Sequence, residues 1–337
     1  MNILVLGGTQ FSGRAFVEQA SEAGHEVTVL HRSKKDPGLP TGVRRLVGDR
    51  DPDIGDGLDQ IGALIDDGER FDAVVDMCGY VPRVVRASCE LLKDAVGMYL
   101  FVSTISVYSH ENDVALDEDA PLCKLDDPTV EVVDGATYGG LKVLCERVVD
   151  EVMGDKACTV RPCVIAGAND PTDRFTWWTR VLGNEEAMVV PSQPAGLIAF
   201  IDARDLAGFM LRCAEHGNFG VFNVVGPEPE FIGIREFIDR AHKALDSQAE
   251  MIECDQDRLG GFGVEPWKSL PLWLGEESQS RHRVLNGRAI AAGLTLRSLE
   301  DTVINTRAWD VARGEPELTA GMKMEQLREV VGVVRSQ

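Results

Sequence analysis

The chain has 337 residues, of which 44% are hydrophobic and 26% charged, a composition typical of a folded globular protein and not of a disordered one. Its length exceeds that of one typical compact domain, so we expect two lobes. The 34 basic and 55 acidic residues give a net charge of −21, which repels phosphates and argues against a nucleic-acid partner.

The sequence shows no membrane or targeting signal. No apolar run approaches the roughly 18 residues that span a bilayer. The first apolar run is too short, and lacks the basic flank, for a signal peptide. We therefore expect a cytoplasmic protein without membrane contact. The eight cysteines include no Cys-x-x-Cys pair and mostly lie in apolar runs, which favours buried thiols over a disulfide or a metal site.

Residues 2–30 have the pattern of a strand, a glycine turn, a helix ended by Gly24, and a second strand. In such a βαβ unit the turn lies at the helix N-terminus, where free backbone N–H groups and the helix dipole bind a pyrophosphate. Gln10 occupies the position of the usual middle glycine. The predicted dinucleotide site comprises Gly7, Thr9, Gln10, Phe11 and Gly13.

A basic cluster follows the second strand. An NAD site usually has an acidic residue about 20 residues after the glycine turn, where it binds the ribose hydroxyls, whereas a basic residue suits the 2′-phosphate of NADP. This chain has His31 and Arg32 there. The pattern favours NADP, with NAD as the alternative; a solvated loop is the other interpretation of these charges.

Two more strands are expected at residues 43–47 and 71–76. Ligands of open parallel sheets bind beyond the carboxyl ends of the strands. Asp49, after the first of these strands, is therefore a candidate to hydrogen-bond the adenine, and Gly79, after the second, a candidate to give the cofactor room. Both also fit ordinary turns.

The strongest chemical pattern begins with a fifth strand, residues 99–102, which ends in Ser103 and Thr104. After a polar loop, Tyr138 and Lys142 lie four residues apart and hence on one helical face. An ammonium one turn away is expected to lower the pKa of the phenol, so that Tyr138 serves as a general acid or base at neutral pH. Thr104 or Ser103 would hold the substrate oxygen. Tyr-x-x-x-Lys alone is a weak pattern, and a packing tyrosine is the alternative; its order after the glycine turn favours catalysis.

The combined motifs resemble the extended short-chain dehydrogenase/reductases, the NAD-dependent epimerase/dehydratase group. Gln10 and the basic loop at Arg32 resemble an atypical branch that includes reductases and chloroplast RNA-binding relatives. The motifs that carry the resemblance are the Gly7 turn, Gly48-Asp49, Ser103-Thr104 with Val107-Tyr108, Tyr138 through Lys142 to Glu146, Val160-Arg161-Pro162, residues 201–207 and residues 221–224.

This resemblance implies an α/β architecture, a Rossmann-type doubly wound parallel sheet with a smaller mixed α/β substrate lobe. The nucleotide-binding domain would span residues 1–165, with 200–226 returning to it, and the substrate lobe mainly residues 166–337. The resemblance also implies that Lys142 binds the nicotinamide ribose and that Thr104, four residues before Tyr108, is the catalytic hydroxyl.

Several positions depart from the family pattern. Sugar-nucleotide dehydratases of the family carry an Asp-Glu pair where this chain has Ile105-Ser106, which disfavours elimination of water. Sugar-nucleotide epimerases usually carry an asparagine and an arginine where this chain has Val164 and Ile198. Because those side chains hold a diphosphate, their replacement favours a small, non-nucleotide substrate.

The second lobe is expected to contain strands at 188–190 and 197–201 and helices at 174–182, ended by Gly183, at 205–214 and at 234–244. The aromatic stretch 267–274 either caps the substrate pocket or packs against the core. Arg281 and Arg283 either meet an anionic substrate or lie in solvent.

The sequence thus predicts an NAD(P)-dependent oxidoreductase that transfers hydride at a hydroxyl or carbonyl carbon of a small substrate, with a reductase favoured. An epimerase that retains its cofactor is one alternative, and a non-catalytic dinucleotide-sensing or RNA-binding Rossmann protein is another. By resemblance, the helices at 82–95 and 138–150 would form the seam of a homodimer.

Overall fold

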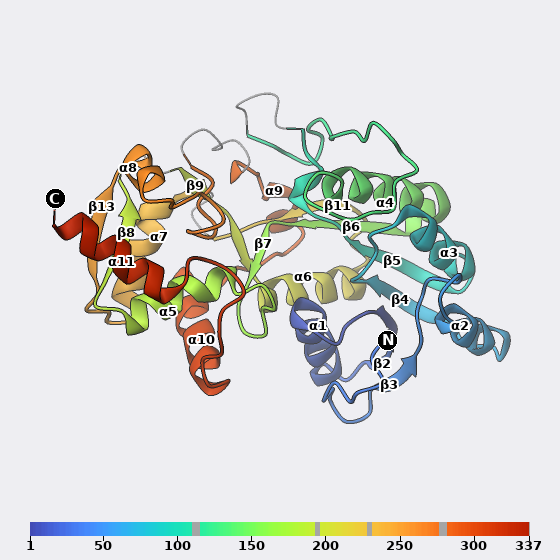
Figure 1. Ribbon diagram of the computed structural model, residues 1–337. Coiled ribbons are helices and arrows are strands. Elements are labelled where there is room, and N and C mark those ends of the chain that lie inside the picture. Colours follow the sequence, from blue (N-terminus) through green and yellow to red (C-terminus); the bar gives the residue numbers. More distant parts are fainter. Residues whose placement is uncertain (110–114, 193–195, 228–230, 276–281, 337) are drawn as a thin grey trace.

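The computed structural model describes residues 1–109, 115–192, 196–227, 231–275 and 282–336, and it forms two lobes (Figure 1). The N-terminal lobe is built on a seven-stranded sheet in which every neighbouring pair is parallel. From edge to edge the strands are β11 (Gly220–Val224), β6 (Ala157–Pro162), β5 (Val96–Val102), β4 (Phe71–Asp76), β1 (Asn2–Leu6), β2 (Glu26–His31) and β3 (Arg44–Val47). The predicted Rossmann-type sheet is confirmed.

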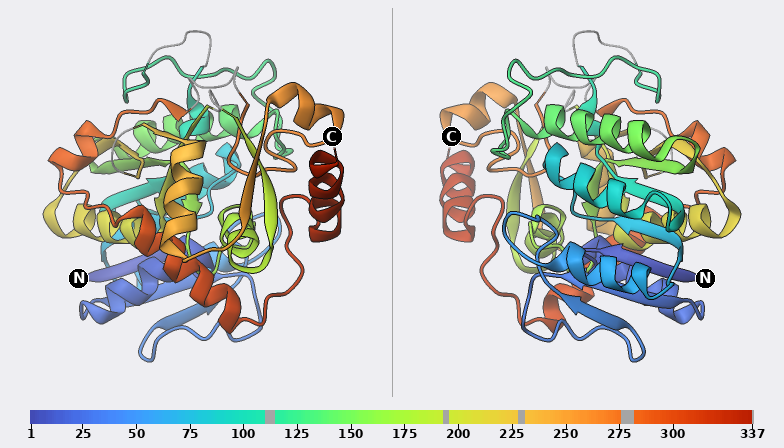
Figure 2. Two further views of the ribbon diagram at one scale, coloured as in Figure 1. Left: turned by 90° about the vertical axis from the view of Figure 1, so that its left-hand side faces the viewer. Right: turned by 90° about the vertical axis from the view of Figure 1, so that its right-hand side faces the viewer.

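Helices cover both faces of this sheet (Figure 2). In β1, Ile3 and Val5 belong to one apolar core, whereas Leu4 and Leu6 belong to the core on the opposite face. A strand buried on both faces is apolar along its whole length, which explains the unbroken run in the sequence. The first core is covered by α1 (Phe11–Glu22) and α6 (Ala203–His216), the second by α2 (Gly57–Asp66), α3 (Pro82–Leu92) and α4 (Tyr138–Met153).

The C-terminal lobe has its own apolar core, in which Trp177, Trp178 and Phe237 are fully buried. Two parallel strands, β8 (Ala187–Pro191) and β13 (Glu250–Cys254), form its small sheet. Its helices are α5 (Arg174–Asn184), α7 (Ile234–Ala244), α8 (Gln256–Gly261), α10 (Leu299–Ala312) and α11 (Met324–Arg335).

Short elements join the lobes. β7 (Val164–Ala166) pairs in parallel with β10 (Phe200–Asp202), and β9 (Leu197–Ile198) pairs antiparallel with β12 (Ile232–Gly233). After β10 the chain returns to the first lobe, because α6 packs beside α1 and β11 extends the large sheet next to β6. The remaining short helices are η1 (Ile105–Val107), η2 (Gly154–Lys156) and α9 (Gly287–Ala291).

Most boundaries differ from the sequence prediction by one to three residues, and three differences have a structural reason. β5 begins at Val96, not at residue 99, because Val96 and Met98 already pair with Phe71 and Ala73 of β4. α5 continues through Gly183, which makes room for Arg307 of α10 instead of ending the helix. The single strand expected at 197–201 is two strands with different partners.

The sequence also predicts buried thiols and no membrane contact. All eight cysteines are free, and six of them are buried. Within the described residues, no helix combines the length and apolar character needed to cross a bilayer.

Candidate functional site

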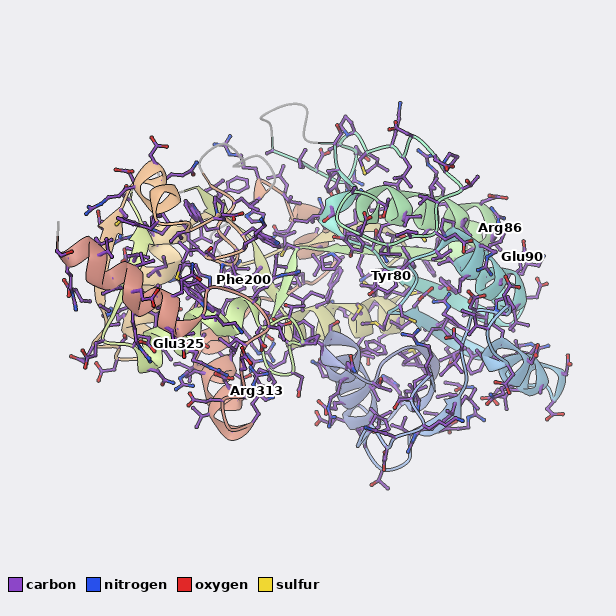
Figure 3. The ribbon with its side chains drawn as sticks, in the orientation of Figure 1. Tyr80, Arg86, Glu90, Phe200, Arg313 and Glu325 are labelled. Atoms are coloured by element: carbon purple, nitrogen blue, oxygen red, sulfur yellow. The ribbon has the colours of Figure 1, made fainter. Side chains whose placement is uncertain are left out.

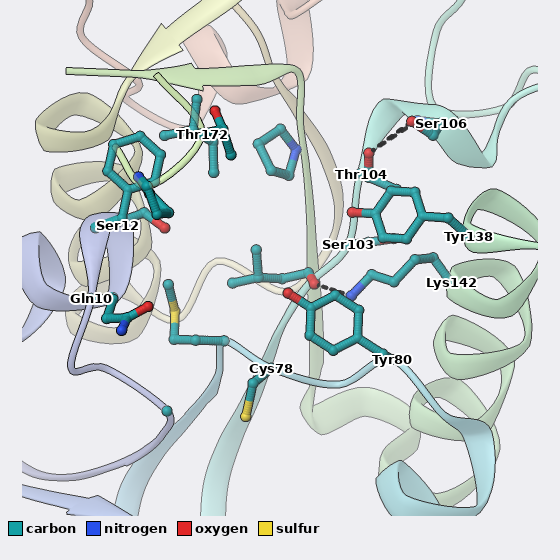
Figure 4. A pocket seen from close by; sticks show the side chains of 18 of the residues that line it. Gln10, Ser12, Cys78, Tyr80, Ser103, Thr104, Ser106, Tyr138, Lys142 and Thr172 are labelled. Carbon is teal, nitrogen blue, oxygen red and sulfur yellow. Dashed lines mark hydrogen bonds between the residues drawn. The ribbon is translucent and has the colours of Figure 1, made fainter. Parts of the chain in front are cut away.

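A cavity of about 1570 Å³ lies beyond the carboxyl ends of β1, β2, β4 and β5 and extends to the second lobe. It brings together the glycine turn, the basic loop after β2, both hydroxyls that follow β5, and the start of α4. Figure 4 shows Gln10 and Ser12 on one side of the cavity and Tyr138 and Lys142 on the other. Of the predicted site residues, only Gly79 is absent from the described cavity wall.

The glycine turn is shaped for close approach of a ligand. Gly7 and Gly8 have φ of 102° and 80°, a region that side chains with a Cβ rarely adopt. A Cβ on Gly13 would lie 2.8 Å from the Gly8 Cα, so the third glycine lets α1 pack directly on the turn. In the described chain no side chain caps the N-terminus of α1, whose first turn also lacks acidic residues. Its free N–H groups are therefore left for an anion.

The end of β2 carries hydrogen-bond donors in place of an acidic residue. His31 is 4% exposed, and burial together with Arg45 lowers the pKa of His31, so the imidazole is neutral at pH 7. The Arg45 guanidinium donates to His31 Nε2 over 3.4 Å, which leaves the proton on Nδ1. That Nδ1 has no partner among the described residues, although His31 lines the cavity. Arg32 is largely exposed, with a nitrogen 3.8 Å from a carboxylate oxygen of Asp49.

The start of α4 places Tyr138 beside the hydroxyls that follow β5 (Figure 4). The Thr104 hydroxyl caps η1 by accepting from the Ser106 N–H, and it donates to the Ser106 hydroxyl at 3.2 Å. Ser103 is 3% exposed, and its hydroxyl has no partner within the described residues. An unpaired buried hydroxyl on a cavity wall is unfavourable unless a ligand completes it. Ser103 is therefore placed to contact a ligand, and Thr104 lies near the phenol, where it opposes the rise in the pKa of Tyr138 that burial causes (Figure 4).

Lys142 is held by backbone oxygens. Its ammonium donates to the carbonyls of Gly79 and Val102 at 2.7 and 2.6 Å, and it lies over the rings of Tyr80 and Phe101. Gly79 itself packs away from the cavity, because a Cβ there would lie 2.6 Å from Phe101. Its position thus serves the packing against Phe101 and the orientation of Lys142, and its role in the passage of a cofactor stays a prediction.

The expected effect of Lys142 on the phenol is corrected by the structure. Burial raises the pKa of Tyr138, and the groups that act in the opposite direction are the Thr104 hydroxyl and the Arg174 guanidinium. Burial lowers the pKa of Lys142 to about 8. Because burial raises its pKa above the ordinary value of about 10, the phenol is protonated at neutral pH.

Tyr80 is a site residue that sequence analysis missed. Its ring lies 6.4 Å from that of Tyr138, centroid to centroid, and it lines the cavity. Burial, followed by the neighbouring Tyr138, raises the pKa of Tyr80 to about 12. Its place directly after β4 was the available signal, because strand ends form the ligand edge of such a sheet.

Residues from the second lobe complete the cavity. Both interpretations of the stretch 267–274 hold in part, because Trp267 lines the cavity while Trp273 is buried in the C-terminal core. Arg174, at the start of α5, lies against the Trp267 ring at 5.1 Å. Arg281 falls outside the described residues. Arg283 has an interaction partner within the protein. The sequence did not mark Arg174, because only the fold brings α5 to the cavity.

A buried ion pair supports the helix that carries Tyr138. Glu146, two turns further along α4, receives two hydrogen bonds from Arg161 of β6, at 3.0 and 2.7 Å. Arg161 also donates to the Tyr108 hydroxyl, which in turn donates to Asn223 of β11. Because the network ties α4 to two strands, it fixes the helix face on which Tyr138 and Lys142 lie.

The sequence matches the model of the NAD dependent epimerase/dehydratase family over residues 3–225. This chain belongs to that family. Its members are enzymes of the extended short-chain dehydrogenase/reductase type, and a nicotinamide dinucleotide is their cofactor. The residues present fit such a cofactor, since the strained glycine cradle, the uncapped α1 and the unpaired atoms of His31 and Ser103 share one cavity. No curated protein matches the sequence.

Solved structures of family members share the fold at low identity. The UDP-glucose 4-epimerase of Thermotoga maritima, solved with UDP-glucose, is 16% identical with a TM-score of 0.67, covering 94% of this chain and 100% of its own. The enzyme WbmH of Bordetella bronchiseptica, solved with NAD⁺, is 16% identical with a TM-score of 0.63, covering 93% and 99%. A human epimerase family protein with NADPH is 18% identical with a TM-score of 0.61, covering 91% and 99%.

Proposed function

We propose that this protein is an NAD(P)-dependent reductase that acts on a carbonyl carbon of a small, non-nucleotide substrate. The observation that supports the proposal most directly is the single cavity that joins the glycine turn to Tyr138, Thr104, Ser103 and Lys142. A nicotinamide dinucleotide supplies the hydride when bound. The protonated Tyr138 phenol gives its proton to the substrate oxygen, and the free Ser103 hydroxyl orients that oxygen.

The raised pKa of Tyr138 suits reduction. A phenol that remains protonated at neutral pH is a proton donor, and reduction of a carbonyl needs a donor at the oxygen where negative charge develops. The positions of Val164 and Ile198 add support, because neither side chain can hold the diphosphate of a sugar nucleotide.

We propose NADP as the preferred cofactor. The neutral His31, with its free Nδ1–H, is a donor where an NAD site has a carboxylate acceptor, and Arg32 beside it adds a positive charge. Asp49 is the candidate to bind the adenine. Its contact with Arg32 is long, at 3.8 Å, so a phosphate can replace Asp49 as the partner of Arg32. The 2′-phosphate of NADP would meet both basic side chains.

An epimerase that retains its cofactor is the second candidate, because sugar-nucleotide epimerases match this fold over their full length. The two are separated by mixing the purified protein with NADPH or NADH and a panel of small ketones and aldehydes, and following absorbance at the nicotinamide band. Stoichiometric oxidation of NADPH, absent in Tyr138→Phe, supports the reductase. Tightly retained dinucleotide recovered from the denatured protein, with no net oxidation by any carbonyl, supports the epimerase and contradicts the reductase.

We also propose a homodimer through α3 and α4. The two helices lie side by side, with Arg86 of α3 paired to Glu151 of α4. Figure 3 shows Arg86 and Glu90 at the outer end of the first lobe, away from the second. Light scattering on the purified protein measures the mass: twice the chain mass supports the dimer and a monomer contradicts it.

A further inference from the structure

The wall that the second lobe contributes to the cavity carries an arginine without an anionic partner. Arg174 lines the cavity and is half-buried, and among the described residues its guanidinium makes no hydrogen bond or ion pair. The only other arginine of which this is true within the described chain is Arg147, which lies exposed on α4. In a protein with a net charge of −21, an unpaired arginine facing a cavity is exceptional.

The surroundings of Arg174 fix its position. Its guanidinium stacks on the Trp267 ring, which leaves its planar edge free to form paired hydrogen bonds. Trp267 has φ of 65° and donates its backbone N–H to the Trp273 carbonyl at 2.7 Å. A bulky residue in this left-handed conformation is strained, and such strain concentrates at ligand sites.

Neither neighbouring carboxylate forms a hydrogen bond or ion pair with Arg174 among the described residues. Burial raises the pKa of Asp170, and the Arg174 charge acts in the opposite direction. Asp173, which precedes it with φ of 54°, gives its two oxygens to Arg313 at 2.6 Å and to the Thr319 N–H at 3.0 Å. Asp170 is 1% exposed and lines the cavity; one oxygen accepts from Thr172, and the other has no partner among the described residues. The wall thus presents a free cation and a free buried acceptor together.

Arg174 and Tyr138 line the same cavity. Burial raises the pKa of the Tyr138 phenol, and the charge of Arg174 acts in the opposite direction. A group bound by Arg174 therefore lies in the cavity in which the substrate oxygen meets Tyr138. The cofactor phosphates are expected at the other wall, at the N-terminus of α1.

We propose that Arg174, stacked on Trp267, binds an anionic group of the substrate, and that Asp170 accepts a hydrogen bond from a hydroxyl of the same molecule. The substrate class is then a small hydroxylated oxo acid or its phosphate ester. This inference rests on the proposed function and names the substrate of that site. It does not use positions 164 and 198, where sugar-nucleotide enzymes hold their diphosphate.

Anion binding without turnover tests the proposal. The probes are acetate and inorganic phosphate, titrated into protein saturated with NADP⁺ while tryptophan fluorescence is followed, and Trp267→Phe identifies the signal of Trp267. We expect saturable binding that weakens at least about tenfold in Arg174→Gln and less in Arg174→Lys, which keeps the charge but not the planar fork. Preference for acetate or for phosphate distinguishes a carboxylate from a phosphate ester.

Arg147→Gln is the matched control, since it removes an equally unpaired arginine from the exposed surface and should leave binding unchanged. Thermal melting and NADP⁺ affinity are measured for each variant. Unchanged anion binding in Arg174→Gln overturns the proposal, and so does a parallel loss of NADP⁺ affinity, which would assign Arg174 to the cofactor. Anion binding lost in Arg174→Gln, in a protein that never oxidises NADPH, keeps this site while rejecting the reductase.

Discussion

The two walls of the cavity are built in different ways. The dinucleotide wall comes mostly from one continuous stretch, the turn from Gly7 to Gly13 between β1 and α1, whose backbone provides the binding groups. The substrate wall comes from residues about a hundred positions apart, Arg174 and Trp267, whose side chains provide them. A backbone site tolerates little change of sequence, whereas a side-chain site can change its ligand by single substitutions, and this is how one fold serves many substrates.

The largest expected effect comes from removing the proton donor that lies between the two walls. Tyr138→Phe should lower turnover by about 100-fold to 10,000-fold, the range for a lost general acid, while leaving dinucleotide affinity unchanged. Steady-state kinetics and fluorescence titration of NADPH measure the two quantities. Turnover that survives the substitution would remove Tyr138 from the proton path.

Lys142 lies between the walls, and its effect appears in the pH dependence of stability. Its pKa in the folded protein is about 8, below the ordinary 10.5, so between these values the unfolded chain holds a proton that the folded chain has lost. The stability of the wild type relative to Lys142→Met should therefore rise with pH across this window, by roughly 3 kcal/mol, and stay constant below pH 8. Denaturant unfolding of both proteins from pH 7 to 10.5 measures the difference; a flat difference contradicts the lowered pKa.

Gly13→Val tests whether the dinucleotide wall depends on backbone packing. A Cβ at this position would lie 2.8 Å from the Gly8 Cα, so the turn must move, and NADPH affinity should fall by about 100-fold or more. Acetate binding at Arg174, measured without cofactor, should persist because that wall is separate. Gly62→Ala in α2, where a Cβ meets only Leu91 at 3.7 Å, is the control and should change neither.

The smallest effect concerns the choice of cofactor. Arg32→Gln should reduce the preference for NADPH over NADH by about tenfold, as expected for one exposed charge-assisted contact, with the KM of the carbonyl substrate unchanged. The ratio of kcat/KM for the two cofactors is the measurement. A ratio that does not move would place the 2′-phosphate elsewhere.

Sequence alone predicted the dinucleotide wall and the parallel, Rossmann-type architecture of the large sheet. The Gly7 turn, the two-sided apolar strands and the Tyr138–Lys142 spacing are local patterns, and local patterns follow from helix and strand periodicity and from backbone sterics. At Gly183 the local interpretation as a helix end was wrong, since the contact that requires a missing side chain comes from Arg307 of α10.

Only the tertiary structure decided the substrate wall and the state of the acid. Arg174, Tyr80 and Trp267 meet because α5, the end of β4 and the loop after α8 converge on one cavity. The spacing of Lys142 predicted a lowered pKa for the Tyr138 phenol, whereas burial raises that pKa, and two backbone carbonyls hold the ammonium. Desolvation and long-range contact depend on what surrounds a residue in space, and that is not written in the neighbouring sequence.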